Sequence, residues 1–289
     1  MYDLIRVKTE DGLLLNGLYS EGDKNKPAII HIHGFEGDFY TNEFLVRIAQ
    51  KLQENKLAFV LAQNRGTGIQ SWFIKNKKDE IIGASYELLE EAYIDIDAWI
   101  KFLLDKGYKE IILQGHSLGT MKIVRYLFEG NYPNKVKKLV LLAPFDIMQL
   151  LEDATKGKWK EYLKIAEQKV KEGKGMEIVP EYFVDVKMSY QTYVSHRKQD
   201  DFEKMFAVHD KTYKFPLLNK INIPVKIIVG EQDPYFNPAD PKNPQEALDT
   251  LLNNIKNSSG KLIIGSGHGY EGYEDLVAEG VLEFVKENV

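Results

Sequence analysis

Three short stretches of this sequence carry residue types that can perform nucleophilic chemistry together. Ser117 lies between two glycines in GHSLG (115–119), Asp233 ends VKIIVGEQD, and His268 lies in IIGSGHG. A nucleophilic serine needs a base that removes its proton and a third group that orients that base. It also needs N–H donors for the negative oxygen that forms. These three residues therefore suggest a nucleophile, an orienting acid and a base.

The two glycines beside Ser117 give this motif a mechanical meaning. A Gly-x-Ser-x-Gly stretch between a strand and a helix makes a tight turn whose flanking residues must be small. Here EIILQG (110–115) predicts a strand, and SLGTMKIVRYLF (117–128) predicts a helix. An alternative is a serine that only caps the helix, with two glycines for the turn. The motif leaves both interpretations open, so the partners of the serine must decide.

The expected base is His268. Among the six histidines, it is the one that follows Ser117 in a loop just past an aliphatic run near the C-terminus. His196 and His209 fall in a charged, helix-rich region and are poor candidates. The end of a strand is where a loop histidine can reach a nucleophile on a neighbouring strand.

The expected orienting acid is Asp233, which ends another aliphatic run. Asp146 is its competitor, because it follows VKKLVLLAP (136–144), and Glu231 is a weaker candidate. The chain order Ser117, Asp233, His268 is the order of α/β-hydrolases.

Two backbone N–H groups are the expected oxyanion donors. Leu118 directly follows the serine, and Phe35 follows the aliphatic run PAIIHIHG (27–34). Gly34 allows the chain to turn closely at that point.

Aliphatic strands alternate with amphipathic helices along most of the chain, which predicts a mostly parallel central sheet flanked by helices. We expect strands at 4–8, 13–19, 27–34, 58–66, 110–115, 136–144, 223–233 and 261–269, and helices at 41–57, 86–105, 117–128, 244–256 and 272–288. Residues 146–215 break this alternation, since they are charged and helix-like. We expect a core of residues 1–145 and 216–289, with residues 146–215 as a helical cap inserted after the sixth sheet strand.

Together these motifs resemble the α/β-hydrolase superfamily over essentially the whole chain, in its capped serine esterase and lipase branch. That branch includes monoacylglycerol lipases and feruloyl esterases. HGFEGDFYTNEF, NRGTG and EGKGMEIVP also resemble bacterial hydrolases related to siderophore esterases. The resemblance implies an α/β-hydrolase fold, with Ser117, His268 and Asp233 as catalytic residues and Phe35 and Leu118 in the oxyanion hole. One departure is Gln63, where many relatives have an acid, and it puts a local ion pair with Arg65 in doubt.

Other site types have weaker support. His31 and His33 share one face of a strand, as a metal site requires, but no second histidine cluster follows. The alternative is a hydrogen-bonded core histidine and a brace for the oxyanion loop. The glycine pairs at 66/68 and 265/267 do not continue into a phosphate-binding motif. We therefore expect no metal and no cofactor.

Composition restricts partners and location. The 289 residues carry a net charge of −5 and no cysteine, so we expect neither nucleic-acid binding nor disulfides. The N-terminus lacks the features of a signal peptide, and apolar runs are too short to span a membrane, so a cytoplasmic location is expected. The oligomeric state stays open, with a homodimer among the options.

The expected activity is hydrolysis of small to medium acyl or aryl esters through an acyl-enzyme. A thioesterase, an amidase or peptidase with the same residues, and a non-catalytic binding protein are the alternatives. Aromatic residues of the cap either line the substrate pocket or pack the cap: Trp159, Tyr162, Phe183, Tyr190, Tyr193, Phe202 and Phe206.

Overall fold

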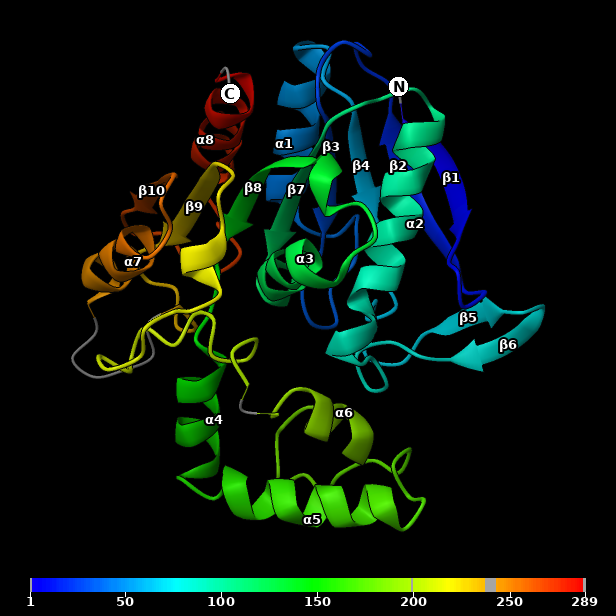
Figure 1. The fold of residues 1–289 in the computed structure, drawn as a ribbon, viewed down its shortest axis with the longest axis vertical. Helices are drawn as coiled ribbons and strands as arrows, with labels where there is room; N and C mark the ends of the chain where they lie inside the picture. Colours follow the sequence, from blue (N-terminus) through cyan, green and yellow to red (C-terminus); the bar gives the residue numbers. More distant parts are fainter. Residues whose placement is uncertain (1, 199, 237–242, 288–289) are drawn as a thin grey trace.

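The structure is a computed structural model, and it describes residues 2–198, 200–236 and 243–287. Eight strands form one sheet in the order β1-β2-β4-β3-β7-β8-β9-β10 (Figure 1). They are β1 (Asp3–Lys8), β2 (Leu14–Ser20), β3 (Ala28–Ile32), β4 (Phe59–Ala62), β7 (Ile111–His116), β8 (Val136–Leu142), β9 (Val225–Gly230) and β10 (Ser258–Ile263). The pairs β1–β2 and β2–β4 are antiparallel, and the other pairs are parallel.

Helices cover both faces of this sheet. On one face lie α1 (Glu43–Glu54) and α8 (Glu274–Lys286), and on the other lie α2 (Ala92–Asp105), α3 (Leu118–Glu129) and α7 (Pro244–Asn253). Successive residues of a strand enter opposite cores: Ile29 joins the α1–α8 side, and Ile30 joins the α2–α3 side. A strand that is buried on both faces must be apolar throughout. The predicted mostly parallel sheet with flanking helices is confirmed.

The order of the strands determines where a site can form. Strand β3 pairs with β4 on one side and with β7 on the other, so the chain winds in opposite directions from this point. In such sheets, ligands bind beyond the carboxyl ends of the strands where the order reverses. The loops after β3 and β7 contain Phe35 and Ser117, so these residues meet at the expected edge.

Some element boundaries differ from those expected. Strand β10 begins at Ser258, on polar residues without an aliphatic pattern, because it is an edge strand that pairs with β9 alone. A short 3-10 helix (Leu89–Glu91) precedes α2, where the sequence predicted continuous helix from residue 86. Helix α7 ends at Asn253 and α8 at Lys286, and the expected end of the last helix at residue 288 lies outside the described residues.

One hairpin was not predicted. Strands β5 (Trp72–Lys75) and β6 (Lys78–Ile81) pair as a separate antiparallel sheet that projects beside the core (Figure 1). All four residues of β6 are exposed, so this strand lacks the alternation of apolar and polar residues that marks a half-buried strand.

Residues 146–215 contain α4 (Ile147–Thr155), α5 (Trp159–Lys171) and α6 (Tyr190–Ser195), which lie beyond the carboxyl ends of the central strands (Figure 1). Leaving residue 199 aside, this region has one isolated bridge and no strand of the main sheet. It is tied to the segment before α2, because Ser189 N–H donates to Ser85 O at 2.8 Å and Leu89 N–H donates to Ser195 Oγ at 2.9 Å.

Several aromatic side chains of this region pack on one another and join the core on the α2–α3 side of the sheet. The rings of Tyr162 and Phe183 are stacked at 4.5 Å, and Tyr193 packs edge-on against Phe183 at 5.3 Å. Phe183 and Tyr193 are buried, so they hold the region together. In the described part of the chain, no helix is both long and apolar enough to cross a membrane.

Candidate functional site

Ser117 lies at a strained turn between β7 and α3. Its backbone has φ 54° and ψ −126°, a conformation that residues other than glycine rarely adopt. It occupies the N-cap position of α3, yet its side chain makes no capping hydrogen bond with the described residues. Strain of this kind concentrates at functional sites. The alternative of a serine that merely caps the helix therefore loses its main support.

The small residues of the motif are required by close packing. A Cβ atom added at Gly119 would lie 2.1 Å from the carbonyl oxygen of Ile32, the last residue of β3. A Cβ atom at Gly115 would lie 2.5 Å from the carbonyl oxygen of Gly119. Any larger residue would push α3 away from the sheet, so the glycines allow the turn at Ser117 to lie close to β3.

The loop after β3 packs directly on this turn. A Cβ atom at Gly34 would lie 2.9 Å from the Cβ of Ser117 and 3.2 Å from the nitrogen of Leu118. Leu118 is the first residue of α3, so its N–H has no carbonyl of the helix to bond. No atom of the described residues accepts a hydrogen bond from the N–H of Phe35. Two free donors thus flank the serine from neighbouring segments.

His33 holds the loop that contains Phe35. Its ring nitrogens lie 3.0 Å from Gly34 O and 2.7 Å from Thr67 Oγ1. The side-chain amide of Asn64 donates to the carbonyl of His33 at 3.2 Å. Burial lowers the pKa of His33 to about 3, so its ring stays neutral. The NRGTG segment, which contains Asn64 and Thr67, therefore braces this loop.

Asp233 and His268 come together from the loops after β9 and β10. Asp233 Oδ2 lies 2.8 Å from His268 Nδ1, and Asp233 Oδ1 accepts the N–H of Tyr235 at 2.8 Å. The Asp233 side chain is fully buried, and that of His268 is 20% exposed. A buried carboxylate bonded to Nδ1 fixes the tautomer of the ring and leaves Nε2 as the free nitrogen.

His268 is placed beside the turn of Ser117 by its neighbours. The ring of His116, the residue before the serine, lies 4.9 Å from the His268 ring, and His116 Nε2 lies 3.0 Å from His268 O. The ring of Tyr235 packs edge-on against His268 at 4.8 Å. Burial lowers the pKa of His116 to about 3, so the His116 ring beside His268 stays neutral.

The other candidate acids have different partners. Asp146 Oδ2 bonds to the ring of His209 and, at 3.1 Å, accepts its N–H. Asp146 Oδ1 accepts the N–H of Gln149 at 3.1 Å and caps α4. Glu231 accepts the N–H of Gly265 at 2.9 Å. Neither carboxylate bonds to His268, and the pairing of Asp146 with His209 was not foreseen.

The metal and phosphate interpretations gain no support from the geometry. His31 is fully buried in the core, where its Nδ1 lies 2.8 Å from Gln114 Nε2. Among the described residues, no group of three or more metal-ligating side chains comes together. The amide of Gly68 bonds to Gly37 O, and that of Gly265 bonds to a carboxylate, so both are occupied within the protein.

Two buried ion pairs involve α3 and the NRGTG segment next to the site. Lys122 Nζ lies 2.5 Å from Glu87 Oε1, and both side chains are fully buried. Arg65 lies 2.8 Å from Asp95, 2.5 Å from Glu91 and 3.4 Å from Asp11, so its partners come from the region of α2 and the turn before β2, and not from residue 63. Arg65 therefore forms its ion pairs without an acidic residue at position 63. The sequence signal for the Lys122–Glu87 pair was a lysine among the apolar residues of the predicted 117–128 helix.

One protein-family model and a number of solved structures match this chain. A sequence model of one protein family matches residues 17–211, and that family is described as "Protein of unknown function (DUF1749)". No curated protein sequence matches the chain significantly. Solved structures do resemble it over nearly the whole length.

Three of these structures are hydrolases. Est1E from Butyrivibrio proteoclasticus, solved with ferulic acid bound, is 22% identical with a TM-score of 0.63, and the match covers 97% of each chain. The esterase Pf2001 from Pyrococcus furiosus is 18% identical with a TM-score of 0.56, over 98% of this chain and 92% of that one. GrgF from Penicillium sp. sh18, an α/β hydrolase, is 15% identical with a TM-score of 0.69, over 99% and 98%. At these identities the likeness shows the fold, which is the expected α/β-hydrolase fold.

Proposed function

The chain belongs to the DUF1749 family, and from its site we propose that it is a serine hydrolase that cleaves carboxylic esters. The observation that carries the proposal is the hydrogen bond between the buried Asp233 and His268 beside the strained turn of Ser117. The esterases among the structural neighbours support the same class of reaction.

In the proposed reaction, Ser117 Oγ attacks the carbonyl carbon of the ester while His268 takes the serine proton. The electron pair of the carbonyl bond moves to oxygen, and the N–H groups of Phe35 and Leu118 stabilise the resulting oxyanion. Asp233 stabilises the protonated ring. As the carbon–oxygen bond to the alcohol breaks, His268 gives its proton to the leaving oxygen.

The second half of the reaction releases the acid. Water loses a proton to His268 and attacks the carbonyl carbon of the acyl-enzyme, forming a second oxyanion at the same donors. The bond to Ser117 Oγ then breaks, and His268 returns the proton to the serine. No cofactor or metal takes part in these steps.

We assign residues 146–215 as a cap over a core of residues 1–145 and 216–289. The position of α4–α6 beyond the carboxyl ends of the central strands supports this assignment (Figure 1). A cap restricts the size of substrates, so small to medium acyl or aryl esters fit best. The ferulic acid bound to Est1E supports the inclusion of aryl esters.

The test compares Ser117→Ala with Ser259→Ala, a serine of β10 outside the site. The first variant should lose turnover of p-nitrophenyl acetate and labelling by a fluorophosphonate probe, whereas the second should keep both. Labelling of Ser117→Ala at the wild-type level would disprove the proposal. A panel of p-nitrophenyl esters, a thioester and an amide then ranks ester hydrolysis against thioesterase and amidase activity, and dominant amide cleavage would overturn the preference for esters.

A further inference from the structure

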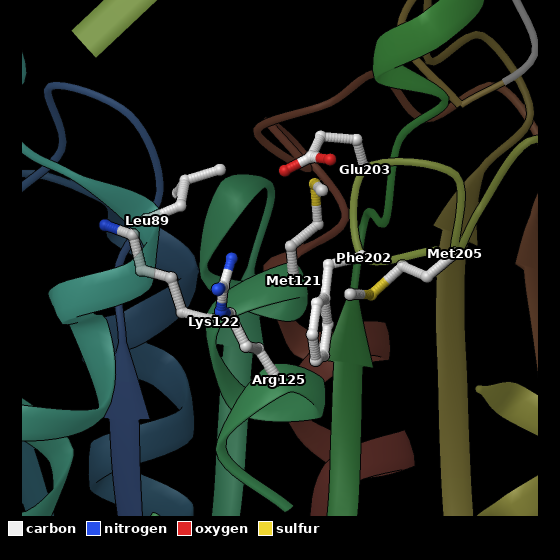
Figure 2. Close-up of a pocket in the computed structure, with 7 residues that line it drawn as sticks. All are labelled: Leu89, Met121, Lys122, Arg125, Phe202, Glu203 and Met205. Carbon is white, nitrogen blue, oxygen red and sulfur yellow. The ribbon is translucent and has the colours of Figure 1, made fainter. Parts of the chain in front are cut away.

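Two cavities border the proposed cap, and they differ in size. The smaller lies between α3 and residues 202–205 (Figure 2), and its volume of about 10 Å³ is the space of one water molecule. The larger lies between α4, the first turn of α5 and residues 204–210, and its volume is about 310 Å³. Small-molecule sites have volumes of roughly 300–1,000 Å³, so the larger of the two can hold a small organic ligand.

Three side chains that can carry positive charge line the larger cavity from separate segments, and polar atoms form much of its exposed lining. They are Lys160, Lys204 and His209. Lys160 Nζ lies 5.3 Å from the ring centroid of Trp159, which also lines the cavity, so this ammonium group stays at the cavity wall. Lys204 is half-buried, and neither lysine side chain forms an ion pair or a hydrogen bond with a described residue. A half-buried ammonium group without a partner favours a negatively charged ligand.

His209 is held in an orientation that suits the same kind of ligand. Its Nδ1 bonds to the buried Asp146, which leaves Nε2 as the nitrogen available to a ligand. Burial opposes the charged form of the ring, but the hydrogen bond and attraction to Asp146 raise the pKa of His209. Below the ordinary value of 6.5 the ring is therefore protonated, and Nε2 is a charged donor.

Two carboxylates also line the cavity, but both are bonded within the protein. Glu152 Oε2 accepts the ring N–H of Trp159 at 2.7 Å. Asp210 Oδ1 accepts the backbone N–H and the hydroxyl of Thr212 at 2.9 and 2.7 Å. The two negative charges would nevertheless repel a dianion such as phosphate, so the lining favours a ligand with a single negative charge.

Apolar side chains complete the lining, with the half-buried Met148 and the ring of Trp159 among them. We propose that this cavity binds a small organic carboxylate. The charged group of the ligand meets the two lysines and His209, and its apolar part packs against Met148. No residue of the proposed catalytic set lines the cavity, so the inference is independent of the proposed function.

The test uses benzoate as the probe and benzamide, a neutral molecule of nearly the same shape, as its counterpart. Isothermal titration calorimetry at about pH 6, where His209 carries its charge, gives the two Kd values. The wild type should bind benzoate about 10-fold more tightly than benzamide, or better, because charge-assisted hydrogen bonds are lost with the amide. Benzoate should also change the tryptophan fluorescence, and Trp159→Phe should remove that change.

Lysine variants then locate the binding. Lys204→Met should raise the Kd for benzoate by about 10-fold, and Lys160→Met by about 3-fold because Lys160 is exposed. Lys204→Arg retains the charge and should keep most of the affinity. Lys164→Met is the matched control, since it removes the same charge from α5 at an exposed position outside the cavity, and it should leave the Kd unchanged.

Several outcomes would overturn the site. They are equal Kd values for benzoate and benzamide in the wild type, no detectable binding of benzoate, or wild-type affinity in both Lys160→Met and a Lys204→Met variant whose circular dichroism shows a native fold. The exposed Lys160 can be replaced with little risk to folding, so the test stands even where Lys204→Met does not fold. Inorganic phosphate that binds more tightly than benzoate would refute the assignment of a singly charged ligand.

Discussion

Two histidine–aspartate pairs lie at the same edge of the sheet, and they differ in what surrounds the imidazole. In each pair, a buried aspartate follows a parallel strand and its Oδ2 meets Nδ1 of the histidine: Asp233 after β9 with His268, and Asp146 after β8 with His209. The N–H of Asp146 also donates to Tyr235 O at 3.2 Å, so one tyrosine lies next to both pairs.

The surroundings decide what each pair can do. His268 packs against His116, the neighbour of Ser117 in the chain, so the proposed nucleophile lies next to this pair. His209 lines a cavity of about 310 Å³ whose lining has charged groups such as Lys160, Lys204 and Glu152 but neither serine nor threonine. Asp146 also caps α4 and bonds the backbone of His209, so its pair ties the start of residues 146–215 to their end. A histidine–aspartate pair alone is therefore a weak indicator of catalysis.

Removing the negative charge from each aspartate in turn should separate the roles of the two pairs most clearly. Asp233→Asn should lower kcat by about 10⁴-fold, because it destroys the tautomer that the base needs. Asp146→Asn should lower kcat by less than about 10-fold, since His209 takes no part in the proposed reaction. Steady-state hydrolysis of p-nitrophenyl acetate gives both values, and circular dichroism confirms folding. The opposite ranking would transfer the orienting role to Asp146.

The next largest expected effect is the loss of stability in a variant of Asp146. Asp146→Ala removes both the cap of α4 and the bond to His209, and loss of a capping aspartate alone costs about 1 kcal/mol. We expect the free energy of unfolding in urea to fall by about 2 kcal/mol. Asp153→Ala, an exposed aspartate in the same helix, is the control and should change it by less than about 0.5 kcal/mol. Equal effects of the two variants would show that the second pair contributes nothing to stability.

The sequence predicts the first pair and not the second, for a physical reason. Asp233 and His268 each follow a parallel strand with aliphatic residues near its end, and the carboxyl ends of such strands meet at one edge. His209 follows no strand. It reaches Asp146, 63 residues earlier, because the intervening region folds back onto the core, and no local pattern encodes that return. The hairpin of β5 and β6 was missed for a related reason, since β6 is exposed throughout and lacks the apolar pattern of buried strands.

The smallest predicted effect concerns the pH dependence of the unfolding free energy, to which two histidines of residues 146–215 should contribute in opposite directions. Burial opposes the charged form of His209, but its hydrogen bond and attraction to Asp146 outweigh burial and raise its pKa. A raised pKa in the folded state stabilises the protein below the ordinary histidine value of 6.5, and this stabilisation is lost as the pH rises through the folded value. The unfolding free energy of wild type minus that of His209→Gln should thus be greater at about pH 5.5 than at about pH 9.

His196 lies in the same region, and its contribution to stability should change with pH in the opposite direction to that of His209. It therefore serves as the matched contrast. Burial, with Arg197 and Lys122 nearby, lowers its pKa to about 3, so the folded state resists protonation that the unfolded chain accepts below pH 6.5. Its contribution must then weaken as the pH falls, and the difference between wild type and His196→Gln should be smaller at about pH 5.5 than at about pH 9. Urea titrations at both pH values measure the two differences. Slopes of the same sign would mean that the carboxylate of Asp146 does not govern the protonation of His209.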